Sequence, residues 1–194
     1  MRPARALALA TLAAGSAGAI SGLYFGLVTG ALTLDLGVGR RLRPLGPIEV
    51  AIEAPREVVY DVATAPYAAR ATRAMREKVT VMERGPGLVL AAHRTPVGSV
   101  LGRPLTATTT ETVALEPPER IRFRLLRGPV PHVIETFQFT EVHADATLLC
   151  YDGELGTDLW SLGQCWGDLV ARTWEDTVRA SLGPIKPEAE RRTQ

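Results

Sequence analysis

Residues 158–182, DLWSLGQCWGDLVARTWEDTVRASL, are the most informative stretch of the sequence because they combine helical length with one apolar face. At 100° per residue, apolar and small side chains fall on one side of this helix and charged side chains on the other. Thr157 or Asp158 is placed to cap its start, and Gly183-Pro184 ends it. The expected inner face comprises Leu159, Trp160, Gly163, Trp166, Gly167, Val170, Trp174, Thr177, Val178 and Ser181. The pattern predicts a long helix packed across a sheet.

The chain upstream of this helix alternates apolar and polar residues with the two-residue period of strands. A first strand, PIEVAI, begins at Pro47 and is followed by expected helices at 56–64 and 67–74. Further strands are expected at 77–84, 87–95, 104–115, 119–126, 132–142 and 146–155. In one of them, RIRFRLL, arginines alternate with apolar residues, which indicates an antiparallel sheet with one covered face and one solvated face.

This order of strand, two helices, six strands and long helix resembles that of the START/Bet v 1-like superfamily, also called SRPBCC or polyketide cyclase/dehydrase-like. The local sequence resembles it too, in IEVAIEAPREVVYDVAT (48–64), DATLLCYDGEL (145–155) and the closing helix at 162–186. The resemblance covers residues 47–186 and leaves 187–194 as a polar tail. It implies an α+β helix-grip fold, in which a curved seven-stranded antiparallel sheet surrounds the C-terminal helix.

The N-terminal part of the chain is apolar. Residues 1–5 form a basic flank, 6–34 hold no charged residue, and 35–46 have the composition of a linker. A helix of about 20 apolar residues crosses a bilayer, so 6–34 is predicted to be a transmembrane anchor. A cleaved signal peptide is the alternative, with Ala17-Gly18-Ala19 as the cleavage site. For a single-pass membrane protein the orientation is nearly balanced, with three positive groups before the span, counting the α-amine, and Arg40, Arg41 and Arg43 after it. The close spacing of these three arginines leans towards a cytoplasmic main domain, and the opposite orientation stays open.

Glycines recur every four residues along this apolar span. They are Gly18, Gly22, Gly26 and Gly30, which fall on one helix face. In lipid, such faces let two helix backbones approach closely, so the pattern predicts a homodimer. A bias towards alanine and glycine is the alternative explanation.

Composition excludes several classes of function. The net charge is +1, which gives no basic footprint for nucleic acid. The three histidines, His93, His132 and His143, stand apart, so no metal site is predicted. No phosphate-binding loop, dinucleotide fingerprint or nucleophile elbow occurs, and no cofactor is predicted. Cys150 and Cys165 are expected to be free thiols.

The expected function is the binding of a hydrophobic small molecule, a lipid or polyketide-like compound, in a cavity between sheet and helix. Tethering to the membrane would keep this cavity near its cargo. Gly163 and Gly167 remove side-chain volume from the inner helix face, as a cavity floor or through close packing. The candidate ligand-binding residues are Gly163, Trp166, Gly167, Val170, Trp174, Phe123, Phe137, Phe139, Tyr151 and His93.

Two alternatives stay open. The resemblance implies that a cyclase or aromatase could act in the same cavity and use a few polar groups for proton transfer. The candidates for such transfer are His93, Tyr151, Asp152 and Glu135, and none is singled out as catalytic. The second alternative is an interaction module whose cavity has collapsed.

Overall fold

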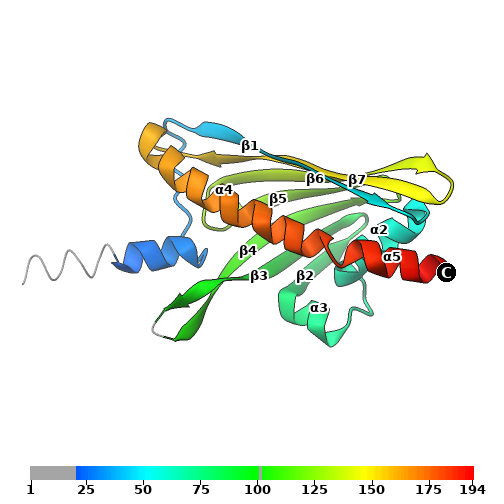
Figure 1. Ribbon diagram of the computed structural model, residues 1–194. Helices are drawn as coiled ribbons and strands as arrows, with labels where there is room; N and C mark the ends of the chain where they lie inside the picture. The colour runs from blue at the N-terminus through cyan, green and yellow to red at the C-terminus, as the bar shows by residue number, and fades with distance from the viewer. Residues whose placement is uncertain (1–20, 101) are drawn as a thin grey trace, which may run out of the picture.

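The computed structural model describes residues 21–100 and 102–194, and its centre is one curved antiparallel sheet (Figure 1). The seven strands lie in the order β1-β7-β6-β5-β4-β3-β2. They are β1 (Arg41–Ile52), β2 (Val79–Gly85), β3 (Leu88–Val100), β4 (Arg103–Glu116), β5 (Arg120–Arg127), β6 (His132–His143) and β7 (Ala146–Thr157). The expected α+β architecture, a curved seven-stranded sheet with a long C-terminal helix, is confirmed.

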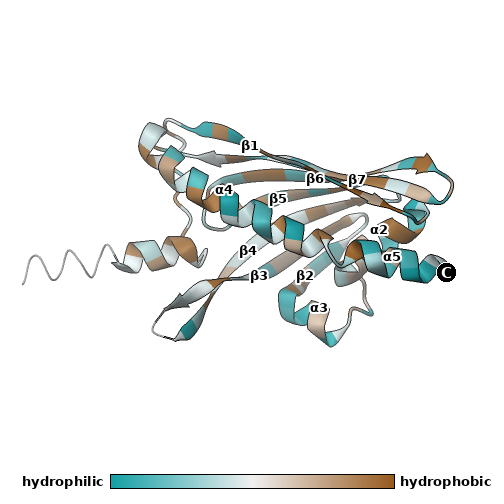
Figure 2. Cartoon of the chain, viewed as in Figure 1, coloured by the Kyte–Doolittle hydropathy of each residue, from teal (hydrophilic) through white to brown (hydrophobic). Residues whose placement is uncertain are grey.

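The long helix α4 (Trp160–Leu182) crosses the concave face of the sheet, as Figure 1 shows. The other helices are α2 (Arg56–Thr64), the 3-10 turn η1 (Ala65–Tyr67), α3 (Arg73–Lys78) and α5 (Ile185–Thr193). Hydrophobic and hydrophilic residues alternate along the strands in Figure 2, as a sheet with one covered face requires. The core therefore lies between the sheet and these helices.

Several element boundaries differ from those expected. β1 begins at Arg41, where it pairs with Thr157 of β7, so residues 41–46 are strand rather than linker. The expected helix at 67–74 is replaced by η1 and α3, because Thr72 caps a helix that starts only at Arg73. The expected polar tail is largely helical: α5 buries Ile185 and Ala189 against the domain.

The start of α4 is built differently from a capped helix. Leu159 and Trp160 both have positive φ angles, of 67° and 50°, and no side chain caps the first turn. The predicted cap by Thr157 or Asp158 is therefore wrong. The Asp158 carboxylate is buried and instead accepts hydrogen bonds from the backbone N–H groups of Leu36 and Gly37, at 2.6 and 2.8 Å. The Arg40 guanidinium donates to it at 2.7 Å.

Asp158 thereby fastens an N-terminal segment that crosses the end of the sheet. The carbonyl of Thr29 accepts a hydrogen bond from Thr108 of β4, and the Thr33 hydroxyl bonds both backbone groups of Gly128. Residues 21–28 form a helix, and Gly30 then adopts a φ of 69°. The predicted continuous helix over 6–34 is therefore wrong for 29–34, whose backbone bonds to the domain.

No helix within the described part of the chain is both long and apolar enough to cross a bilayer. The predictions for residues 1–20, which include the basic flank, most of the anchor and Gly18, concern residues outside the described part of the chain. Gly22 and Gly26 lie in the helix at 21–28, and an added Cβ on Gly26 would touch Leu32 at 3.2 Å. Because Gly30 has left the helix, it does not share a helix face with Gly22 and Gly26.

Candidate functional site

A buried carboxylate lies where α4 crosses the inner face of the sheet. Glu135 of β6 is only 6% exposed, and its Oε1 accepts two hydrogen bonds of 2.6 Å. One comes from the Tyr151 hydroxyl of β7 and the other from the indole N–H of Trp174 on α4. Gly153 of β7 pairs with Glu135 across the ladder, and a Cβ there would lie 2.5 Å from the Ile134 carbonyl. The glycine thus allows the strands to approach beneath the carboxylate.

A second buried group of polar side chains lies on the β3 and β4 side of the same face. His93 Nδ1 is 2.9 Å from Oε2 of Glu111, whose side chain is 5% exposed. His93 Nε2 is 3.2 Å from the Tyr67 hydroxyl. When the imidazole is neutral, Nδ1–H donates to Glu111 and Nε2 accepts from Tyr67. The three residues form a relay from a hydroxyl through an imidazole to a carboxylate.

Aromatic rings connect the two polar groups. The His93 ring lies 6.4 Å from Phe123, Phe123 lies 5.2 Å from Phe137, and Phe137 lies 5.5 Å from Tyr151, measured between centroids. Phe123 also pairs directly with Glu135 across β5 and β6. The inner face is therefore apolar along its middle, with a carboxylate and an imidazole on either side.

Burial changes the acid strength of Glu135. Loss of solvation, helped by repulsion from Glu111, raises the pKa of Glu135 to about 7, although hydrogen bonds from Tyr151 and Trp174 oppose the rise. Near neutral pH this carboxyl group is therefore able to hold or release a proton. Carboxyl groups with pKa values raised in this way serve as general acids.

The pKa of His93 reflects opposing causes. Burial lowers it, while the hydrogen bond and the charge of Glu111 raise it, and the net shift is upward. Burial, with the charge of Glu111, also raises the pKa of Tyr67 well above its usual range. Tyr67 is thus a neutral hydroxyl, and His93 is the basic member of the relay.

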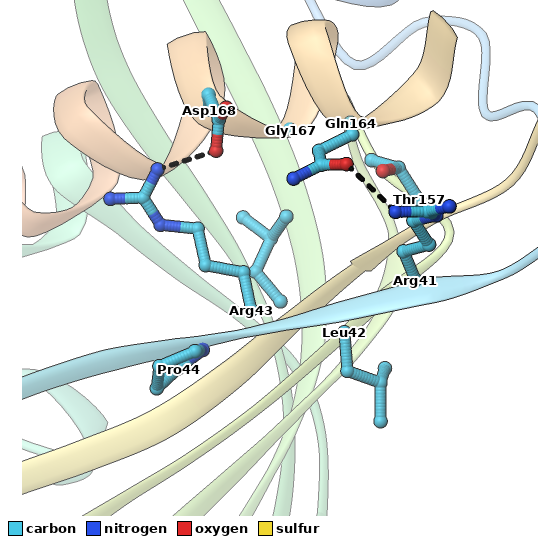
Figure 3. A pocket seen from close by; sticks show the side chains of 9 residues that line it. Arg41, Leu42, Arg43, Pro44, Thr157, Gln164, Gly167 and Asp168 are labelled. Atoms are coloured by element: carbon cyan, nitrogen blue, oxygen red, sulfur yellow. Dashed lines mark hydrogen bonds and ion pairs between the residues drawn. The ribbon is translucent and has the colours of Figure 1, made fainter. Parts of the chain in front are cut away.

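A groove of about 500 Å³ opens between β1 and α4 (Figure 3). Leu155, Thr157 and Gly167 line it, and a Cβ on Gly167 would lie 3.1 Å from the Thr157 hydroxyl. Two polar contacts join β1 to α4 here. Arg43 pairs with Asp168 at 2.7 Å and Arg41 donates to Gln164 at 3.2 Å.

The groove and Glu135 share two elements. Leu155 in the groove and Tyr151 beside Glu135 are four residues apart on one face of β7, which is about 13 Å along a strand. Gly167 and Trp174 are seven residues apart on α4, which is about 10 Å along a helix. The groove is therefore about 10 to 13 Å from the Glu135 carboxylate along these two elements, a distance that a small molecule can span.

The structure brings together six of the residues singled out in the sequence: His93, Phe123, Glu135, Phe137, Tyr151 and Trp174. Gly167 lines the groove, and Val170 is buried on the adjoining turn of α4.

Other candidates lie elsewhere. Phe139 packs against Tyr60 of α2, and Trp166 donates to the Pro129 carbonyl. A Cβ on Gly163 would lie 1.6 Å from the Asp158 carbonyl, so close packing explains this glycine. Asp152 is exposed, and Trp160, expected on the inner helix face, is 55% exposed.

Sequence reasoning missed Glu111 and Tyr67. Glu111 follows the alternation of β4, whose buried positions include Ala107, Thr109 and Val113, so an acidic residue at an inward position was the available signal. No comparable signal marked Tyr67, which lies in the short η1 turn.

Within residues 21–100 and 102–194, no three potential metal ligands gather at one point. In the same part of the chain both cysteines are free, as expected, and Cys165 is exposed.

Solved structures with a similar fold come from several sources. One is the Streptomyces aromatase/cyclase Zhui, which is 20% identical to this chain with a TM-score of 0.59. The match covers 80% of this chain and 96% of Zhui. The di-domain aromatase/cyclase BexL is 23% identical over 78% of this chain and 50% of the other, with a TM-score of 0.55. A norcoclaurine synthase point mutant from Thalictrum flavum is 10% identical with a TM-score of 0.57, and the match covers 80% of this chain and 97% of the synthase chain.

The chain has the helix-grip fold. No protein-family model matches it, and no curated protein matches its sequence. At these identities the likeness shows the fold alone.

Proposed function

We propose that this protein binds a hydrophobic carbonyl compound between α4 and the sheet and catalyses proton transfer on it, leading to ring closure or dehydration. The proposal rests on one observation: Glu135 lies on one side of an aromatic interior and the His93–Glu111 relay lies on the other. Similar solved structures named aromatase/cyclases support it at the level of fold.

The two polar groups divide the chemistry. Protonated Glu135 donates a hydrogen bond to the carbonyl oxygen of the bound molecule, and His93 Nε2, in exchange for its contact with Tyr67, accepts a proton from the adjacent carbon. The carbon–hydrogen bond breaks and an enolate forms, whose oxygen keeps the hydrogen bond from Glu135. The enolate carbon then attacks a second carbonyl of the same molecule, and the proton on His93 passes to the new alkoxide.

Glu111 has the supporting part in this scheme. Its carboxylate holds the imidazole by Nδ1 and stabilises the imidazolium that forms during the reaction.

Two other functions are possible for this fold: binding of a ligand without chemistry, and a protein-interaction module without a ligand. The membrane anchor, the cytoplasmic orientation and the glycine-mediated homodimer stay predictions.

The groove supplies the first test. Gly167→Leu places a branched side chain against Leu155 and Thr157, so we expect affinity for a hydrophobic aryl 1,3-diketone to fall at least tenfold. Ala180→Leu, on the exposed side of the same helix, is the matched control and should bind like the wild type. Quenching of tryptophan fluorescence measures both, since Trp174 lies beside Glu135.

Equal affinities of Gly167→Leu and the wild type would contradict binding through the groove. If no hydrophobic probe binds the wild-type protein and native mass spectrometry of the purified protein finds no small molecule, the interaction module becomes the better account.

A further inference from the structure

Exposed apolar side chains gather at one end of the domain. Nine of the fifteen large hydrophobic side chains that are exposed in the described chain come from residues 23–38 and 160–169. They are Leu23, Tyr24, Phe25, Leu32, Leu36, Val38, Trp160, Leu162 and Leu169, here called the apolar end surface. Leu162, at 74%, is the most exposed of them. A concentration of apolar side chains on a solvent-exposed face usually marks an interaction site.

Contacts between the two stretches place them side by side at this end of the domain. The Tyr24 ring lies 6.3 Å from Trp166 of α4. The Leu159 and Trp160 N–H groups donate to the carbonyls of Val38 and Gly39, at 2.8 and 3.0 Å. The helix at residues 21–28, which carries hydrophobic colours in Figure 2, lies at this same end of the domain.

Trp160 is held outward by unusual backbone geometry. Leu159 and Trp160 both have positive φ angles, which are costly for residues other than glycine. A Cβ on Gly39 would overlap the Trp160 ring, so the glycine makes room for the indole against the N-terminal segment. The fold therefore keeps a large aromatic residue 55% exposed, and tryptophan is the residue enriched at the interface of membrane and water.

Charge near the surface is compensated. Arg40 pairs with Asp35 and Asp158, and Arg43 pairs with Asp168. These arginines are therefore engaged within the domain, and the surface presents little net charge. That favours an apolar, neutral occupant over an acidic partner.

The sequence before this surface indicates that the apolar, neutral occupant is a lipid bilayer. Residues 6–20 hold no charged side chain and lead directly into residue 21, at the edge of the apolar end surface. We propose that the surface docks on a lipid bilayer, with Trp160, Leu162 and Leu169 inserted at its interface. This inference is independent of the chemistry proposed above, although it would turn the end of the domain nearest the groove towards membrane-dissolved cargo.

Tryptophan quenching tests the docking. The full-length chain is reconstituted with phosphatidylcholine vesicles whose acyl chains are brominated near the headgroup. Because Trp166 and Trp174 are both partly buried and hydrogen-bonded inside the domain, Trp160 should supply most of the quenching. Trp160→Phe should then lose at least half of it, and Trp174→Phe should keep it.

A second pair of variants separates docking from folding. Leu162→Glu with Leu169→Glu should reduce quenching at least fivefold. Met82→Glu with Val142→Glu, at positions that are also more than half exposed but lie on other elements, should leave it unchanged. Quenching should change less than twofold between low salt and 0.5 M salt, because burial of apolar area and not charge drives the contact.

Three results would overturn the proposal: wild-type protein that does not associate with the vesicles, vesicle-bound protein whose Trp160 is not quenched, or a Leu162/Leu169 double variant quenched like the wild type. Sedimentation without lipid identifies the competing occupant. If a dimer forms there and the double Glu variant abolishes it, a second copy of the chain covers the surface instead. Turnover is not read in any of these measurements, so they fail independently of the proposed chemistry.

Discussion

Glu135→Gln is expected to remove about 3 kcal/mol of pH dependence from the free energy of unfolding. Below pH 4.5 the carboxyl group is protonated in both the folded and the unfolded chain. Between pH 4.5 and about 7 the unfolded chain loses this proton while folded Glu135 keeps it, so the wild type becomes less stable as pH rises. A pKa raised from 4.5 to about 7 corresponds to about 3 kcal/mol. Glutamine keeps the acceptor oxygen for Tyr151 and Trp174 without titrating.

Urea unfolding at pH 4 and pH 8 measures this difference. Relative to the wild type, Glu135→Gln should gain stability as pH rises, and Glu83→Gln, at an exposed position on β2, should follow the wild type. Because the charge of Glu135 helps to raise the pKa of His93, the comparison measures Glu135 together with its effect on His93. Parallel pH profiles for wild type and Glu135→Gln would contradict a buried, proton-holding carboxyl group.

Asp158→Ala is expected to lower the free energy of unfolding by about 2 to 4 kcal/mol. The change leaves two backbone N–H groups and the Arg40 guanidinium without their buried acceptor. Asp168→Ala is the matched comparison, because its ion pair with Arg43 is partly exposed and worth less than about 1 kcal/mol. Urea unfolding gives both values, and hydrogen exchange at the Leu36 and Gly37 amides shows whether the N-terminal segment detaches.

The pH dependence of Asp158 has the opposite sign from that of Glu135. The hydrogen bond from Arg40, with those from the Gly37 and Leu36 amides, holds the pKa of Asp158 below its usual 3.8 despite burial. Its stabilisation is therefore present above pH 3.8 and is lost as pH falls further. Equal small losses for Asp158→Ala and Asp168→Ala would show that Asp158 does not fasten the segment.

Local patterns predicted the sheet and the long helix because those elements depend on burial of one face. The alternation of RIRFRLL becomes β5, and its inward residues Ile121 and Phe123 are buried as expected. The residues of α4 that approach the sheet, such as Val170 and Val178, are buried for the same reason.

Features that depend on distant parts of the chain escaped prediction. Asp158 has the position of a helix cap, but its partners lie more than 115 residues earlier in the chain. Trp160 falls on the apolar helix face by periodicity, yet positive φ angles at the start of α4 turn it outward. Glu111 and Tyr67 become site residues only because both meet His93, which no spacing in the sequence reveals.

A protein that moves a proton to and from a bound carbonyl compound exchanges hydrogen at the carbon next to the carbonyl. Proton NMR near pH 7 measures this exchange as uptake of deuterium from D₂O into a hydrophobic aryl 1,3-diketone. We expect the wild type to accelerate exchange well above the uncatalysed rate. Glu135→Gln and His93→Phe should each lower that rate at least a hundredfold while still binding the probe. Tight binding of the probe without faster exchange in the wild type would contradict proton transfer by this protein and would show that it only binds the compound.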